Sequence, residues 1–205
     1  LSTIIHKEKV MEKDNVVAEP ITEKKTARTR KTTTKAAKTR TVDDLKPSDR
    51  VEVRNLRAWE LSFIPRDGNV EQVTKGIIIN PSQKTMFKLS EIEDQVNNGN
   101  ELFCGIDGLG GHASLQIVDS LVREYVFGEP TNPVQLTSEA VNELLAIESK
   151  PLFNQRLSEL VVTNSEKRMI AIMCTNHALY PDVNIDDAPS YKLAAIEKIS
   201  GIKLS

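Results

Sequence analysis

A basic, low-complexity run at residues 24–40 sets the strongest limit on how this chain folds. It holds eight basic residues and no acidic one, and the stretch TARTRKTTTKAAKTRT is built almost entirely from Thr, Lys, Arg and Ala. Ordering such a segment costs about 1 to 2 kcal/mol per residue in backbone entropy, and it has too little apolar surface to offset that cost. Residues 1–46 show no sustained apolar periodicity, so we predict a disordered basic arm.

The basic run at residues 24–40 contrasts with the rest of the chain, which is acidic. Subtracting its eight positive charges from the net charge of −2 leaves −10 for the rest of the chain. Small Thr and Ala side chains between the cations would let the arm follow a phosphate backbone. It could equally lie on an acidic protein surface, or be a solvated tail with no partner. The candidate contact residues are Lys24, Lys25, Arg28, Arg30, Lys31, Lys35, Lys38 and Arg40.

A β-rich module is expected over residues 47–128. Apolar and polar residues alternate from Val51, which predicts half-buried strands, and Ser90 with Glu93 predicts a capping box for a short helix. Residues 122–127 fit either a last strand or one face of a helix. We expect a barrel-like or sandwich-like arrangement. The apolar strand positions are Val51, Val53, Trp59, Leu61, Phe63, Ile77, Ile78, Ile79, Met86, Phe87, Leu89, Leu115 and Ile117.

A linker at residues 129–135 separates this module from a second one. Two prolines stand within it, at Pro130 and Pro133, directly after Gly128. Apolar residues beyond it recur at helical spacing, and Pro151 suits the first turn of a helix. Four helices are predicted over residues 136–205, and the fold class is therefore α+β.

The loop at residues 105–112 is the one glycine-rich segment that invites a catalytic interpretation. A phosphate-binding loop would end in Gly-Lys-Ser/Thr, whereas Gly111 is followed here by His112 and Ala113. We therefore favour a tight turn or close-packing loop, with a ligand site as the alternative. An acid–base set of Asp107, Asp119 and His112 would require these residues to meet in space.

The sequence favours neither a metal site nor a cofactor. Cys174 and His177 have a metal-like spacing, but zinc requires three or four ligands and no second Cys/His pair exists. We expect Cys174 in the core and His177 on a partly exposed helix surface. The only other cysteine, Cys104, is 70 positions away, which makes a disulfide scaffold improbable and predicts reduced, buried thiols.

Three segments of the β-rich part resemble the β module of small structural proteins of tailed bacteriophages. They are RVEVRNLRAWELSFIPRDG, GIIINPSQKTMFKLSEIEDQV and LQIVD. The later segments QLTSEAVNELLAIESKPLFNQRLSEL and SYKLAAIEKISGIKL resemble the helical half that follows in that family. The resemblance covers roughly residues 48–128 and 136–203 and leaves the arm unaccounted for.

This resemblance implies a non-enzymatic, multi-copy virion protein with no catalytic residue and no cofactor. Its partners would be capsid or connector subunits, with the arm contacting those subunits, packaged DNA or both. Such a protein is made in the host cytoplasm and ends up in the virion. The first ten residues lack the features of a secretion signal, and no apolar run approaches the roughly 20 residues that cross a bilayer.

Two other functions remain open. One is a nucleic-acid-binding accessory protein in which the arm is the main functional element. The other is a small enzyme centred on the loop at residues 105–112.

Overall fold

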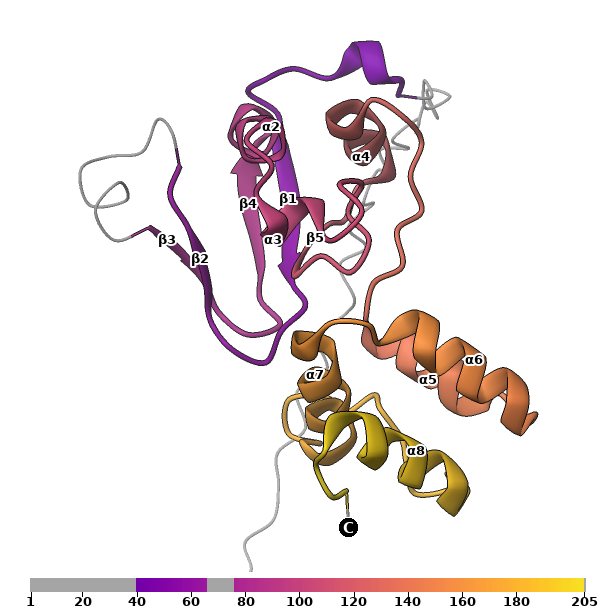
Figure 1. The fold of residues 1–205 in the computed structure, drawn as a ribbon. Coiled ribbons are helices and arrows are strands. Elements are labelled where there is room, and N and C mark those ends of the chain that lie inside the picture. Colours follow the sequence, from indigo (N-terminus) through magenta and orange to yellow (C-terminus); the bar gives the residue numbers. More distant parts are fainter. Residues whose placement is uncertain (1–39, 66–75, 205) are drawn as a thin grey trace, which may run out of the picture. The chain divides into compact units, whose positions relative to one another are not determined.

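A computed structural model describes residues 40–65 and 76–204 (Figure 1). The predicted α+β class is confirmed. The first half contains η1 (Val42–Asp44), β1 (Arg50–Asn55), β2 (Leu61–Phe63), β3 (Ile77–Ile79), β4 (Lys84–Lys88), α2 (Leu89–Asn97), α3 (Glu101–Cys104), β5 (Leu115–Ile117) and α4 (Ser120–Phe127). The second half contains α5 (Ser138–Ala146), α6 (Lys150–Leu160), α7 (Asn164–Thr175) and α8 (Ser190–Ser200).

Strand β1 is the centre of a three-stranded antiparallel sheet with the order β4-β1-β5. Val51 lies opposite Phe87 of β4, and Val53 lies opposite Ile117 of β5. The predicted alternation in β1 is confirmed, because Val51, Val53 and Asn55 are buried while the residues between them are partly exposed. The buried face packs on Leu89 and other side chains of α2, α3 and α4.

A second, two-stranded sheet pairs β2 with β3. Asn55, at the end of β1, ties it to the first sheet: its Nδ2 donates to the carbonyl oxygens of Trp59 and Ile79, at 2.9 Å each. Phe63 of β2 packs against Phe87 and Phe103, with ring centroids 5.2 and 5.3 Å apart. Among the described residues the strands form these two small sheets, and a barrel or sandwich stays a prediction.

One expectation about local structure is wrong. Helix α2 begins at Leu89, and Glu91 rather than Glu93 completes the cap, accepting a hydrogen bond from the Lys88 backbone N–H at 2.8 Å. The sequence signal at Ser90 misplaced the start because β4 runs directly into the helix. Of the two alternatives left open for residues 122–127, the structure shows the helix: they lie in α4, which Asp119 caps at its start and Gly128 ends in a left-handed conformation.

The predicted arm extends too far along the chain. Arg40 forms ion pairs with Asp49 and Asp119, and η1 contacts α4. Leu45 packs against the core of the β-rich module. Residues 40–46 therefore belong to the body of the protein, whereas Lys24, Lys25, Arg28, Arg30, Lys31, Lys35 and Lys38 lie outside the described residues.

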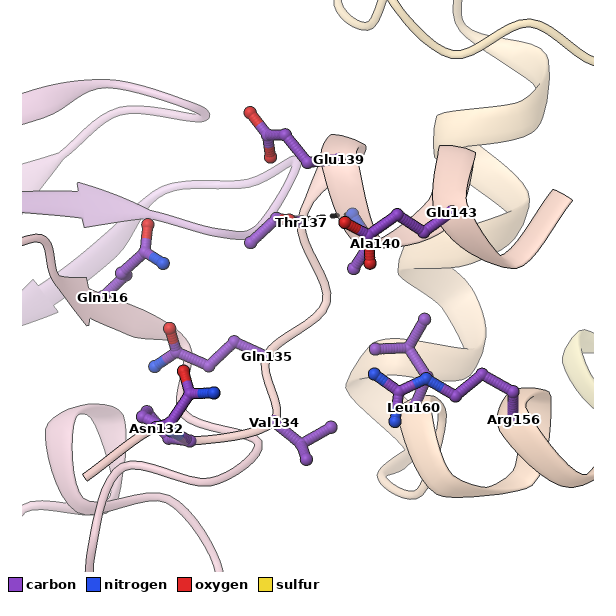
Figure 2. Close-up of a pocket in the computed structure, with 11 residues that line it drawn as sticks. Gln116, Asn132, Val134, Gln135, Thr137, Glu139, Ala140, Glu143, Arg156 and Leu160 are labelled. Carbon is purple, nitrogen blue, oxygen red and sulfur yellow. Dashed lines mark hydrogen bonds between the residues drawn. The ribbon is translucent and has the colours of Figure 1, made fainter. Parts of the chain in front are cut away.

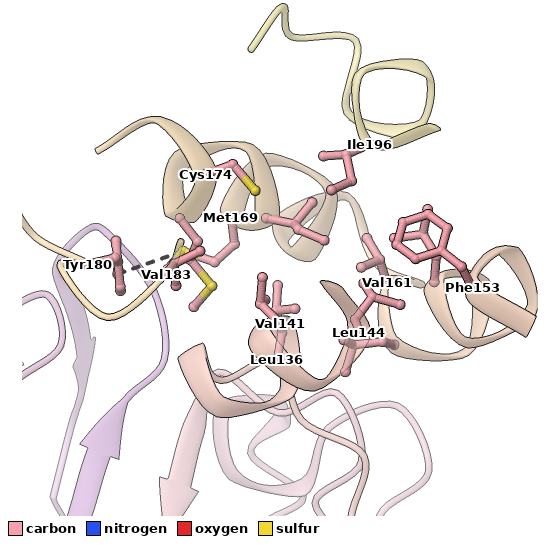
Figure 3. Close-up of a cluster of buried hydrophobic side chains, with 14 residues drawn as sticks. Leu136, Val141, Leu144, Phe153, Val161, Met169, Cys174, Tyr180, Val183 and Ile196 are labelled. Atoms are coloured by element: carbon pink, nitrogen blue, oxygen red, sulfur yellow. Dashed lines mark hydrogen bonds between the residues drawn. The ribbon is translucent and has the colours of Figure 1, made fainter. Parts of the chain in front are cut away.

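The four predicted helices of the second module are confirmed. Thr137 caps α5, Pro151 lies in the first turn of α6, and Gly201 ends α8 with φ +70°. These helices enclose a core of their own, in which Met169, Ile170 and Cys174 of α7 are fully buried (Figure 3). In the described part of the chain, none of the helices has both the length and the apolar character needed to cross a membrane.

Burial gives Cys174 a testable chemical property. Loss of solvation raises the pKa of its thiol to about 11, so the reactive thiolate is scarce in the folded protein. Because the folded pKa is raised, Cys174 stabilises the fold at neutral pH and loses this contribution as the pH rises above the pKa of the unfolded thiol. We expect Cys174→Ala to flatten the alkaline fall in unfolding free energy relative to the parent protein, measured by urea titration at several pH values.

Candidate functional site

The glycine-rich loop at residues 105–112 is a closed turn. The carboxylate of Asp107 accepts hydrogen bonds from the backbone N–H groups of Leu109 and Gly111, both at 2.8 Å. Six of the loop's N–H groups donate to acceptors within the protein, those of Gly105, Ile106, Leu109, Gly110, Gly111 and His112. The expected close-packing turn is confirmed, and these six donors are directed to the chain's own acceptors rather than to a phosphate.

The loop places His112 against a buried carboxylate of the helical module. His112 Nδ1 lies 2.9 and 3.1 Å from the two carboxylate oxygens of Glu166, which is 0% exposed. His112 has φ +59°, a left-handed conformation that is uncommon for a residue other than glycine. Its backbone N–H donates to the Val134 carbonyl at 2.7 Å, so the linker is fixed at the same point.

Glu166 also belongs to the capping box at the start of α7, in which Thr163 is the N-cap residue. Its Oε2 accepts from the backbone N–H groups of Val162 (3.0 Å) and Thr163 (2.9 Å) and from the Thr163 hydroxyl (3.1 Å). Thr163 accepts in return from the Glu166 backbone N–H at 3.2 Å, which completes a capping box. One carboxylate thus starts a helix and joins it to the loop of the other module.

A buried arginine completes this junction. Arg57 is 1% exposed, and its Nη2 donates to the carbonyl oxygens of His112 (3.3 Å) and Ala113 (3.2 Å). Burial lowers the pKa of Arg57, while the nearby negative charge of Glu166 opposes that effect. We name Arg57, His112 and Glu166 the junction cluster.

The junction cluster contains residue types that serve in acid–base catalysis, but its hydrogen bonds join separate parts of the fold. A histidine oriented by a carboxylate acts as a general base when its other ring nitrogen faces a nucleophile. Within residues 40–65 and 76–204, no hydroxyl or thiol is hydrogen-bonded to Nε2 of His112. The arrangement therefore favours a role in holding the loop, the linker and α7 together.

The other acid–base candidates serve separate parts of the fold. Asp107 closes its own loop, and Asp119 accepts from the Leu121 backbone N–H at 2.9 Å as the cap of α4. Sequence reasoning missed Glu166 as the partner of His112, because 54 positions separate them. The signal that was available, the Thr163-x-x-Glu166 capping pattern, indicates a helix start and not a link between modules.

A polar cleft lies between β5, the linker, α5 and α6 (Figure 2). Its volume is about 360 Å³. Amide side chains and the guanidinium of Arg156 face it, which suits hydrogen bonding to a polar ligand. The residues around it are Gln116, Asn132, Pro133, Val134, Gln135, Thr137, Glu139, Ala140, Glu143, Arg156 and Leu160.

The cysteine–histidine spacing does not form a metal site. Cys174 is fully buried as expected, whereas His177 is exposed and lies beyond the end of α7 rather than on it. Within residues 40–65 and 76–204, no group of three or more His, Cys, Asp or Glu side chains is placed to hold a metal ion.

Of the eight arm cations, the structure places only Arg40, which pairs with two carboxylates of the body itself. Comparisons of the chain with protein-family models, with curated proteins and with solved structures found no match.

Proposed function

We propose that this chain is a structural, non-enzymatic component of a tailed-phage virion, associated with the capsid or the connector and present in many copies. Its basic arm contacts neighbouring subunits, packaged DNA or both. The observation that carries the proposal is the separation of charge, with eight cations in residues 24–40 and −10 on the rest of the chain. An acidic body repels a polyanion, so contact with DNA would be confined to the arm.

The geometry of the body supports this proposal. The residues with acid–base capacity that come together, Arg57, His112 and Glu166, are used to join the loop, the linker and α7. A structural use of these residues is consistent with a protein whose function is to bind partners at its surface.

Arg40 has a different role from the other seven cations. Its ion pairs with Asp49 and Asp119 hold the point where the arm leaves the body. Contact with a partner is therefore assigned to the seven cations from Lys24 to Lys38.

If the seven cations contact phosphates, affinity for duplex DNA should fall steeply with salt and depend little on base sequence. A log–log slope of about −0.9 per contact gives roughly −4 for four or five engaged cations. Replacing the seven residues with Gln should flatten the slope, measured by fluorescence anisotropy. The matched control is Lys46→Gln with Lys84→Gln and Lys88→Gln, three exposed cations of the body that should leave the slope unchanged.

If the arm instead packs on neighbouring subunits, DNA binding at physiological salt should be negligible, and deleting residues 1–39 should reduce incorporation into particles. An arm-deleted protein that assembles and functions like the intact one would refute both versions.

The density of cations in the arm also favours a second candidate, a sequence-independent nucleic-acid-binding accessory protein. That protein would bind DNA with the same salt dependence but would be absent from purified particles.

A further inference from the structure

The helical module carries a groove that the core does not fill. It lies between α6 and α8 beside the start of α7, with a volume of about 700 Å³. Its floor is apolar, formed by the buried side chains of Leu157 and Val161 and the partly exposed Ala195 and Ile199. Val162, at one end of it, is 44% exposed. An apolar floor of this kind suits a ligand with an apolar face.

The charged residues that line the groove are all positive. They are Lys150, Lys167 and Lys198, and no carboxylate lies among the lining residues. In residues 40–65 and 76–204 none of these three lysines forms an ion pair. On a chain that carries −10 outside residues 24–40, the groove is a local positive site.

The lysines stand at both ends of the apolar floor. Lys150 Nζ lies 5.7 Å from the ring centroid of Tyr191, which places the first turns of α6 and α8 together. From there the groove extends along both helices towards Lys167 and Lys198. Each helix has 11 residues, which corresponds to about 16 Å of length, or three turns.

We propose that this groove is a docking site for an amphipathic helix of a partner protein. The apolar stripe of that helix lies on Leu157, Val161 and Ile199, and carboxylates at both ends of the stripe pair with the lysines. A third helix in the groove between two others follows ordinary helix packing, and three turns match the length of the floor. The complementary charge determines which helices bind.

The groove contains no residue of the arm. Failure of helix docking and failure of the proposed function are therefore separate results. A groove that binds nothing leaves the arm's salt dependence intact, and an inert arm leaves the groove intact.

The test uses the full chain and a synthetic helical peptide of about 14 residues, with a leucine stripe and glutamates on both sides of it. Fluorescence anisotropy of the labelled peptide should show saturable binding. The triple variant Lys150→Glu, Lys167→Glu, Lys198→Glu should weaken it by roughly tenfold to a hundredfold. A matched peptide with lysines in place of glutamates should show the reverse preference and bind the triple variant better than the parent.

The control is the variant Lys46→Glu, Lys84→Glu, Lys88→Glu, which changes the net charge equally at a distance from the groove and should not alter binding. Ala195→Trp fills the floor and should abolish binding without a change in net charge. Thermal melts confirm that each variant is folded.

Three outcomes would overturn the proposal. In the first, the acidic peptide binds no better than the basic one. In the second, the parent protein binds anionic lipid vesicles and the triple variant does not, while the peptide binds neither protein. In the third, the parent protein is a dimer in sedimentation that the triple variant dissociates, which would make a second copy the occupant.

Discussion

Replacing Glu166 with alanine should lower the free energy of unfolding by about 3 to 5 kcal/mol, because several donors lose one buried carboxylate acceptor at once. The carboxylate is 0% exposed and accepts from the Val162 and Thr163 backbone, the Thr163 hydroxyl and His112. Its loss leaves these donors without an acceptor and removes the partner of Thr163 in the capping box of α7. It also removes a negative charge that favours the charged form of the buried Arg57.

Equilibrium urea unfolding measures this effect. Glu159→Ala is the matched control, because Glu159 is exposed on α6 and pairs only with neighbours on the same helix, so its loss should cost about 0.5 kcal/mol or less. A double-mutant cycle with His112→Ala should give a coupling of about 1 to 3 kcal/mol between the two residues. If Glu166→Ala cost no more than Glu159→Ala, the junction cluster would have no structural importance.

Replacing Gly105 with alanine should destabilise the protein by about 3 to 5 kcal/mol, at the upper end for a single substitution. Gly105 has φ +63°, and a Cβ there would lie 1.8 Å from the Gly111 carbonyl oxygen and 2.7 Å from its carbon. Both atoms are backbone, so relief requires the loop to open. Opening it would break the hydrogen bond from the Ile106 N–H to the Gly111 carbonyl and displace His112 from Glu166.

Gly108 in the same loop is the matched control, because its backbone is also left-handed but an added Cβ would not clash with any atom. Its φ is +79°, but a Cβ there meets nothing within 4 Å. Gly108→Ala should therefore cost only the left-handed penalty of about 1 to 2 kcal/mol. Equal costs at the two positions, measured by urea unfolding, would contradict the close packing of the loop.

The parts of the fold that local chemistry determines were predictable from the sequence. Alternation in β1 and the helical spacing of α5 to α8 each reflect which side of one element is buried. The apolar run Ile77–Ile79 predicted strand β3 but not its burial, since Ile78 is 54% exposed. Pro151 and Gly201 mark a helix start and a helix end because their backbone preferences favour those positions.

Long-range contacts were not predictable. Nothing in the residues around His112 or Glu166 indicates that they meet, since the pairing depends on how the two modules pack. Helix α4 was ambiguous because its apolar residues fit both periodicities, although Asp119 and Gly128 were usable cap signals. The end of the arm was misplaced because Arg40 reads as one more cation of the run, whereas its pairing with Asp49 and Asp119 depends on the folded body.

Quantitative mass spectrometry of particles purified from cells that produce this chain tests the proposed function most directly. We expect the polypeptide in every particle preparation, at a fixed ratio to the capsid or connector subunits. That ratio should fall when residues 1–39 are deleted and stay constant for the control Glu159→Ala. Absence of the chain from particles, or trace amounts that vary between preparations, would contradict the account.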